Sequence, residues 1–254
     1  MPSIRENLSN WDDQGKWTQD GDEWSESWGS SATMWAGTIM PRIGACLPVR
    51  ELVEIACGHG RVTQFLLPHC DRYRGFDLAP TCVAVCTERF ADRRHATFAG
   101  TDGSSLPGID AASVDFVVSW DSLVHAERDA MVGYVREIGR VLLPGGTAFL
   151  HHSTMADHVD PSGKLTVANP HWRGTTVSAG SVRADAEAAG LRVVVQELVA
   201  WGSPTLSDCF TLLHKPSGDS GPAREPVLLR NTAFNSELAY LSELDRSYRR
   251  ALRG

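Results

Sequence analysis

The strongest constraint on the fold is a regular alternation of short apolar runs and amphipathic segments between residues 51 and 150. We predict strands over residues 51–56, 73–78, 96–100, 114–119 and 147–150. The longest connecting segment, 126–142, has a helical apolar face and ends at Pro144-Gly145-Gly146. Because strands that alternate with helices form parallel sheets, the pattern predicts a doubly wound α/β domain.

The pattern loosens after residue 150. We predict a loop over 151–177 and a helix over 178–189 that ends at Gly190. Two β-rich runs, 191–200 and 209–214, follow, and we expect them to pair antiparallel and close a seven-stranded sheet. Residues 216–223 are a predicted linker before a final helix with one apolar face. The expected organisation is an acidic, Trp-rich cap (1–49), a core (50–215) and a linker with a C-terminal helix (216–254).

The N-terminal segment combines acidic residues with five of the eight tryptophans: Trp11, Trp17, Trp24, Trp28 and Trp35. Disordered tails are poor in aromatic residues, so we expect this segment to pack. The spacing of the last four tryptophans predicts one helical face. Two interpretations stay open, a structural cap and a lid that closes over a ligand.

The overall composition excludes several classes of protein. A net charge of −7 argues against nucleic acid as a partner. The longest apolar runs are too short for a membrane span, and the first residues do not resemble a secretory signal. The six cysteines contain no C-x-x-C pair, so we expect neither a disulfide framework nor a zinc site. We therefore expect a cytoplasmic location.

Polar residues and glycines gather where the predicted strands end, which is where α/β sheets bind ligands. Gly58 and Gly60 follow the first strand and allow a ligand close to the backbone. Asp77 ends the second strand, and Asp102-Gly103 follows the third. Three such strand ends in this order predict an adenosine site. A dinucleotide motif would have a third glycine at Thr63, which disfavours the alternative of a nicotinamide-dependent oxidoreductase.

The sequence E-I-A-C-G-H-G at 54–60, with Asp77, Asp102 and the run E-I-G-R-V-L-L-P-G-G at 137–146, resembles class I S-adenosylmethionine-dependent methyltransferases. The resemblance covers about residues 50–215 and departs from the family at Ala56, where a glycine is common. It implies S-adenosylmethionine as cofactor. The cofactor-binding residues that it implies are Glu54, Ala56, Gly58, Gly60, Asp77, Leu78, Asp102, Gly103 and Ser119.

The catalytic candidates follow the fourth and fifth strands. Asp121 and His125 lie after the fourth strand, and His151-His152 end the fifth. A histidine can take the proton of a hydroxyl acceptor. Since strand neighbours point to opposite faces, we expect His152 in the cleft as the base and His151 in the packing, with the reverse as the reserve. Asp121 and His125 would orient the acceptor.

A magnesium ion is a further candidate, because catechol-type methyltransferases bind one through an Asp after the fourth strand. Asp121 matches that position, and His152 would be its second ligand. Histidine suits magnesium poorly, since hard cations prefer oxygen. The metal site therefore stays an open alternative.

Tryptophans interspersed with Asp, Gln and Ser in the N-terminal segment are typical of saccharide sites. We therefore expect an O-methyltransferase of a sugar hydroxyl, and the chain loosely resembles actinobacterial sugar O-methyltransferases. Other small-molecule O or N acceptors, and a degenerate partner subunit, remain alternatives. The C-terminal helix could mediate a homodimer or pack on its own sheet. No membrane is expected as a partner.

Overall fold

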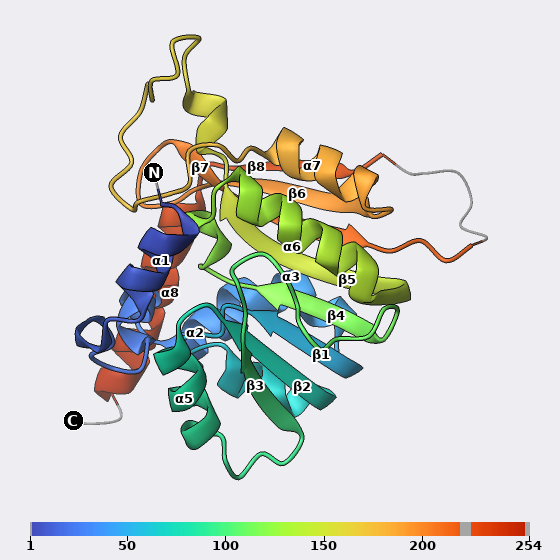
Figure 1. Cartoon of the computed structure of the whole chain (residues 1–254). Helices are drawn as coiled ribbons and strands as arrows, with labels where there is room; N and C mark the ends of the chain where they lie inside the picture. The colour runs from blue at the N-terminus through green and yellow to red at the C-terminus, as the bar shows by residue number, and fades with distance from the viewer. Residues whose placement is uncertain (1, 219–224, 252–254) are drawn as a thin grey trace.

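The computed structural model describes residues 2–218 and 225–251, and its centre is one eight-stranded sheet (Figure 1). The strands are β1 (Val49–Ile55), β2 (Cys70–Asp77), β3 (Ala96–Gly100), β4 (Val114–Ser119), β5 (Leu142–Ser153), β6 (Arg192–Ala200), β7 (Leu206–His214) and β8 (Val227–Asn231). Their order is β3-β2-β1-β4-β5-β7-β6-β8. Only β7 pairs antiparallel, with β5 and with β6. The predicted doubly wound, mostly parallel sheet with an antiparallel pair is confirmed.

The sheet has eight strands and not the predicted seven, because β8 joins its edge beside β6. Val227, Leu228 and Leu229 in β8 are 52%, 65% and 47% exposed, so no buried face imposes an alternating pattern on the sequence. The strand lies in the stretch that we predicted as linker and helix. Residues 219–224 of the predicted linker lie outside the described residues.

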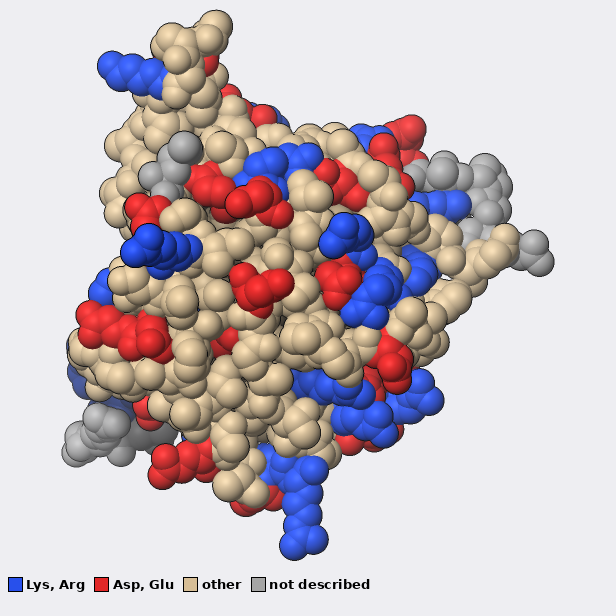
Figure 2. Space-filling view, in the orientation of Figure 1, with Lys and Arg blue, Asp and Glu red and all other residues tan. Residues whose placement is uncertain are grey.

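Helices cover both faces of the sheet, and on the side of the molecule drawn in Figure 2 acidic and basic side chains are interspersed over the surface. The connecting helices are α4 (Thr63–Leu66), α5 (Pro80–Arg89), α6 (Arg128–Val141) and α7 (Ala179–Ala188), with short 3-10 turns η5 (Leu67–His69), η6 (Leu123–His125) and η7 (Met155–His158). Alternate residues of β1 join different core clusters: Val53 and Ile55 pack with α6 and α7, and Leu52 packs with the N-terminal segment and α8. This alternation leaves the carboxyl ends of the strands as the place for polar side chains.

The N-terminal segment consists of short turns and not of one long helix. Its elements are α1 (Ile4–Trp11), η1 (Gln14–Lys16), η2 (Asp22–Trp28), α2 (Ser31–Met34), η3 (Trp35–Ile39), α3 (Met40–Ile43) and η4 (Gly44–Cys46). Gly21 and Gly29 flank η2 with φ of +91° and +84° and break any continuous helix. The predicted single helical face of tryptophans is therefore wrong. Trp11, Trp17 and Trp24 instead pack edge to face, with centroids 4.7–6.1 Å apart.

The C-terminal helix α8 (Phe234–Ala251) lies beside the N-terminal segment (Figure 1). The Asp245 carboxylate accepts hydrogen bonds from Thr33 Oγ1 at 2.7 Å and Ser30 Oγ at 3.2 Å. Phe234 and Leu238 are buried, whereas Tyr248 is exposed. The first half of α8 thus packs on its own chain. Within the described ranges, no helix combines the length and apolarity needed to cross a membrane.

Candidate active site

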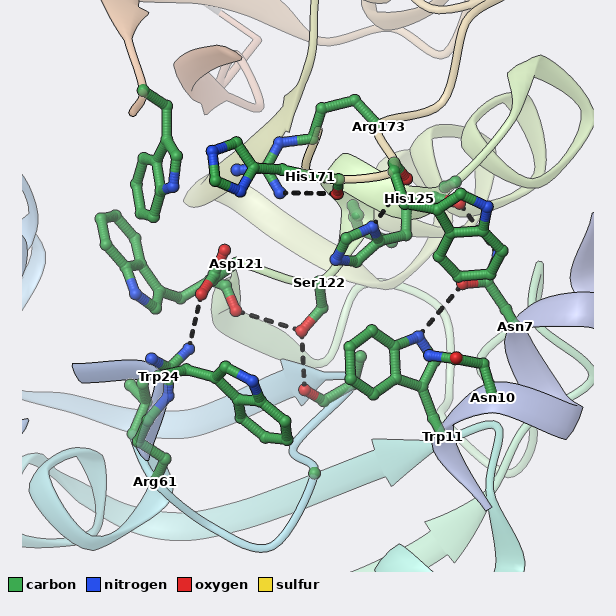
Figure 3. A pocket seen from close by; sticks show the side chains of 18 of the residues that line it. Asn7, Asn10, Trp11, Trp24, Arg61, Asp121, Ser122, His125, His171 and Arg173 are labelled. Atoms are coloured by element: carbon green, nitrogen blue, oxygen red, sulfur yellow. Dashed lines mark hydrogen bonds and ion pairs between the residues drawn. The ribbon is translucent and has the colours of Figure 1, made fainter. Parts of the chain in front are cut away.

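A large cavity lies at the carboxyl ends of β1, β2 and β4, next to the N-terminal segment (Figure 3). Its volume of about 1060 Å³ lies slightly above the range of about 300–1,000 Å³ that small-molecule pockets occupy. Seven of the eight tryptophans line it: Trp11, Trp17, Trp24, Trp28, Trp120, Trp172 and Trp201. Residues of α8 complete the wall.

Glu54 is a buried carboxylate at one end of this cavity and is the second-last residue of strand β1. Its Oε2 accepts hydrogen bonds from Thr63 Oγ1 at 2.7 Å and from the Tyr73 hydroxyl. Burial raises the pKa of Glu54 to about 7, although both hydroxyls favour the ionised form. The group is therefore near its midpoint at neutral pH and would gain charge beside a cation.

Asp77 lies next to Glu54, at the end of β2. Its oxygens accept from the amides of Gly58 at 2.8 Å and Ala79 at 2.9 Å. Burial raises the pKa of Asp77 to about 6 against these two bonds. Together, Glu54 and Asp77 give this half of the cavity two buried carboxyl groups whose raised pKa values lie close to neutral pH.

The loop after β1 takes left-handed backbone conformations at three alternate positions. Gly58 and Gly60 have φ of +56° and +89°, which glycine adopts without strain. Ala56 has φ of +60°, so the departure from the family pattern keeps a backbone that favours glycine. A Cβ at Gly58 would lie 2.8 Å from the Trp17 indole, which stacks on His59 with centroids 4.0 Å apart. Trp17 therefore covers this loop.

The other predicted cofactor residues separate into two groups. Leu78 and Gly103 line the cavity. The exposed Asp102 instead binds the amides of Ser104 and Ser105 through Oδ1, at 2.9 and 2.8 Å. Ser119 is fully buried and donates to the Ile55 carbonyl at 2.9 Å. Contrary to our prediction, the structure places Gly60, Asp102 and Ser119 outside the cavity lining.

Asp121 forms the other half of the cavity with residues after β4 (Figure 3). Its Oδ2 pairs with Arg61 Nη2 at 2.9 Å. Burial opposes its ionisation, but the positive charges of Arg61 and Arg173 outweigh burial and hold the pKa of Asp121 below its usual value. Asp121 is thus an ionised carboxylate whose charge Arg61 already balances.

His125 also lines this half of the cavity, at the end of η6. Its Nδ1 lies 3.0 Å from the Trp172 carbonyl, which can only accept, so Nδ1 carries the proton and Nε2 is the acceptor. Burial, with the positive charge of Arg173, lowers the pKa of His125 to about 4. His125 is therefore neutral at physiological pH.

His151 and His152 are both fully buried in β5, and neither lines the cavity. His152 Nδ1 contacts the Ser153 carbonyl and its Nε2 contacts Thr211 Oγ1, each at 2.8 Å. Burial lowers the pKa of His152 to about 4. The predicted orientation of His152 into the cleft is wrong: its ring belongs to the packing between β5 and β7. His151 lies closer to the cavity, where its Nδ1 accepts from the Asp121 amide.

The residues do not fit the magnesium site that we considered. Arg61 already occupies the cation position beside Asp121, and both nitrogens of His152 have protein partners. Among the residues that the structure describes, no group of three His, Cys, Asp or Glu side chains is arranged to hold a metal. Asp121 and His152 therefore do not form the predicted metal site.

Sequence reasoning missed two polar residues of this region, Arg61 and Asp208. Arg173 and Asp208 pair in the interior, with Nη2 and Oδ2 2.7 Å apart. A signal for Asp208 was present, because a lone carboxylate within an apolar strand must find a buried partner. His171 also lines the cavity, from the loop that we predicted to lie over the active face.

Residues 52–146 match a protein family described as a methyltransferase domain. No curated protein sequence matches the chain significantly. Among solved structures, the PH0226 protein from Pyrococcus horikoshii OT3 is 16% identical over 82% of this chain and 99% of its own, with a TM-score of 0.59. The N-methyltransferase NodS from Bradyrhizobium japonicum WM9 is 22% identical over 72% and 95%, with a TM-score of 0.54.

The [4+2]-cyclase SpnF is also similar, at 15% identity over 74% of this chain and 81% of its own, with a TM-score of 0.56. At these identities the likeness concerns the fold, and the relatives named here differ in the activities that their names state. The chain thus has the class I methyltransferase fold, and its residues 52–146 match the methyltransferase domain family.

Proposed function

We propose that the protein transfers the methyl group of S-adenosylmethionine to a hydroxyl of a saccharide or glycoside. The observation that carries the proposal is one cavity that joins two sets of residues. Glu54 and Asp77 at the ends of β1 and β2, with Gly58, form one side, and Asp121 and His125 form the other. Methyl transfer requires both ligands in one enclosed space, because the reacting atoms must be aligned.

The donor set of the first side suits S-adenosylmethionine, which supplies a methyl group on a positively charged sulfur. The Glu54 carboxylate would accept from the ammonium group, and Asp77 from the ribose hydroxyls. Gly58 lines the cavity and would allow the ligand close to the backbone, whereas Gly60 packs against Phe90. Leu78 and Gly103 would border the adenine. Asp102 is not among these proposed contacts, since its carboxylate binds its own loop.

The charges of the second side favour a neutral acceptor. Asp121 pairs with Arg61, Asp208 with Arg173, and His125 is neutral. An amine acceptor would be better stabilised by a carboxylate without such a partner. A hydroxyl needs hydrogen-bond acceptors and no net charge, and the unpaired oxygen of Asp121 and Nε2 of His125 supply them.

Indole rings around the acceptor side support a saccharide. Trp28, Trp120 and Trp201 contact one another at centroid distances of 5.4–6.4 Å and present apolar faces beside the polar groups. The N-terminal segment, with Trp17 over the loop after β1, would act as the lid of the site. We expect the reaction in the cytoplasm.

His125 is the proposed general base. As the new C–O bond forms and the methyl C–S bond breaks to leave S-adenosylhomocysteine, the hydroxyl proton would pass to Nε2, while Nδ1–H stays bonded to the Trp172 carbonyl. The fixed tautomer keeps the accepting nitrogen available without a rearrangement. His152 has no such free nitrogen, so it leaves the proposed mechanism.

The first experiment measures S-adenosylhomocysteine binding by calorimetry. We expect the Asp77→Ala variant to bind at least about tenfold more weakly, which corresponds to about 1.4 kcal/mol. Asp110→Ala is the matched control, because Asp110 is an exposed acid in the loop between β3 and β4. Equal affinities for all three proteins would contradict the proposed cofactor site.

The second experiment measures release of S-adenosylhomocysteine with a panel of saccharides, glycosides, catechols and amines. Turnover with a sugar supports the complete proposal. Turnover with amines alone would replace the acceptor class and keep the methyltransferase. Binding of the cofactor product without turnover on any saccharide would refute the saccharide assignment.

A further inference from the structure

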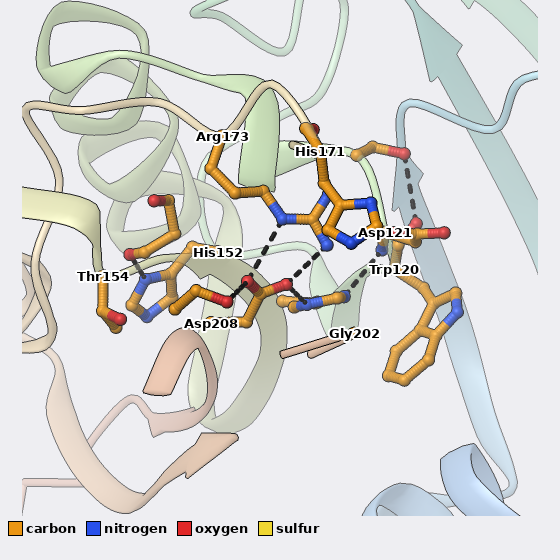
Figure 4. A network of polar contacts seen from close by, with 12 residues as sticks. Trp120, Asp121, His152, Thr154, His171, Arg173, Gly202 and Asp208 are labelled. Carbon is orange, nitrogen blue, oxygen red and sulfur yellow. Dashed lines mark hydrogen bonds and ion pairs between the residues drawn. The ribbon is translucent and has the colours of Figure 1, made fainter. Parts of the chain in front are cut away.

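A buried polar network lies directly behind Asp121 and has no part in the proposed chemistry so far (Figure 4). It consists of His151 and Asp208, both 0% exposed, and Arg173, 4% exposed. His151 Nε2 is 2.8 Å from Asp208 Oδ2. Arg173 donates to both oxygens of Asp208, from Nη2 at 2.7 Å and from Nε at 3.1 Å. The network joins β5, β7 and the loop before α7.

The hydrogen bonds fix the protonation of this network. The Asp121 amide donates to His151 Nδ1 at 3.1 Å, so Nδ1 must be the accepting nitrogen. The ring proton is therefore on Nε2 and donates to Asp208. Burial opposes ionisation of Asp208, but Arg173 and His151 hold its pKa well below its usual value. His151 thus has no nitrogen left for an acceptor proton.

The amide that His151 binds belongs to a strained residue. Asp121 has φ of +54°, in the left-handed region that residues with a side chain adopt less readily than glycine. Such conformations persist where the surroundings determine them. Strand β4, which precedes Asp121, is held in the sheet by its pairing with β5. The amide of Asp121 is bound by His151, and the carboxylate of Asp121 is bound by Arg61.

We propose that His151, Asp208 and Arg173 form a positioning network that fixes the Asp121 backbone in its left-handed conformation and so directs its carboxylate into the acceptor side of the cavity. This role deepens the proposed function and rests on it, because Asp121 would there accept a hydrogen bond from an acceptor hydroxyl. His151 holds the residue that contacts the acceptor and exchanges no proton. The acceptor must accordingly present a donor, such as a second hydroxyl, beside the methylated position.

The energetics agree with a positioning role. Burying a carboxylate and a guanidinium costs several kcal/mol that their attraction only partly returns, so such pairs are poor devices for stability alone. Polar groups with fixed partners do, however, define one arrangement of the chain. The hydrogen-bond partners of Asp208 fix the orientation of its carboxylate, and those of His151 fix the orientation of its ring. In that orientation, Nδ1 of His151 faces the Asp121 amide.

Two conservative variants separate positioning from proton transfer. In His151→Asn, the amide oxygen can take the place of Nδ1 and still accept from the Asp121 amide. In His151→Gln, the longer amide takes the place of Nε2 and keeps the Asp208 contact, but no longer fixes Asp121. We expect His151→Gln to lower kcat by about 10–100-fold and His151→Asn by less than about tenfold, with unchanged S-adenosylhomocysteine affinity.

The pH profile of kcat/KM is the discriminating readout, and it should have the same shape in both variants and in the unmodified protein. His158→Asn is the matched control, because His158 contacts the Leu206 carbonyl near the start of β7 and does not touch Asp121. Loss of activity in both variants, together with loss of a titration from the profile, would assign proton transfer to His151 and overturn the proposal.

A measurement without any acceptor keeps the network testable if the proposed function fails. Long-range ¹H–¹⁵N NMR of the unmodified full chain reports which ring nitrogen of each histidine carries the proton. We expect His151 as the Nε2–H tautomer. An Nδ1–H tautomer or a doubly protonated ring would refute the network, since the Asp121 amide could then not donate to it. Absence of methyl transfer with the expected tautomer would refute the function alone.

Discussion

The pH dependence of cofactor binding follows directly from the two buried carboxyls after β1 and β2. Burial raises the pKa of Glu54 to about 7 and that of Asp77 to about 6. Both groups are therefore partly protonated in the free protein near neutral pH. The proposed ligand brings an ammonium group and two hydroxyl donors, which bind the ionised forms. Binding must then release protons and weaken as the pH falls.

The magnitude can be worked from these values. At pH 6 about nine-tenths of Glu54 and about half of Asp77 carry a proton, whereas at pH 8 nearly all of both are ionised. If the ligand binds only the ionised forms, the Kd for S-adenosylhomocysteine rises about tenfold from Glu54 and about twofold from Asp77. The combined change of about 20-fold corresponds to roughly 2 kcal/mol.

Calorimetry at pH 6 and pH 8, in two buffers with different ionisation enthalpies, measures both the affinity and the protons released. We expect release of about 1.4 protons per ligand at pH 6, mostly from Glu54. Glu54→Gln should reduce the pH effect to about twofold. Glu51→Gln, a buried acid at the other end of β1, should leave it unchanged. Equal Kd values at pH 6 and 8, with no proton release, would refute the reasoning.

Three further predictions address stability and turnover. Ala56→Gly should raise the free energy of unfolding in urea by about 0.5–1 kcal/mol, since glycine relieves the left-handed strain but adds chain entropy; a decrease would contradict the strain. His125→Gln should lower kcat about 100-fold with unchanged S-adenosylhomocysteine affinity, and near-normal turnover would remove His125 as the base. Trp17→Ala should speed S-adenosylhomocysteine dissociation in stopped flow by about tenfold, whereas an unchanged rate would mean that the indole does not cover the ligand.

The parallel strands were predictable because each combines an apolar run with a clear end. Residues 96–100 and 114–119 were assigned to the residue as β3 and β4. The same geometry brings Gly58 and Asp77 to one cavity, since parallel strands end at one edge of the sheet. For this part of the chain, local pattern and global fold agree.

Side-chain directions in β5 could not be predicted in the same way. Which of His151 and His152 approaches the cavity depends on the register of β5 against β7, where His151 lies opposite Phe210 and His152 opposite Cys209. A partner about 60 residues away sets that register, and a shift of one residue exchanges the two faces. The prediction that the N-terminal tryptophans share one helical face was wrong because Gly21 and Gly29 interrupt the helix on which that spacing depends.

The hydrogen bonds that Asp245 of α8 accepts from Ser30 and Thr33 of the N-terminal segment have a consequence for biosynthesis. The first residues of the chain leave the ribosome long before α8, which supplies Leu238 and Ser242 to the cavity wall. The nascent chain can assemble the sheet from β1 to β7 while its last helix is still unmade. The α8 side of the cavity is completed only once α8 has been made and has packed against the N-terminal segment, so a chain still lacking α8 would already contain Glu54 and Asp77 but would lack this part of the wall.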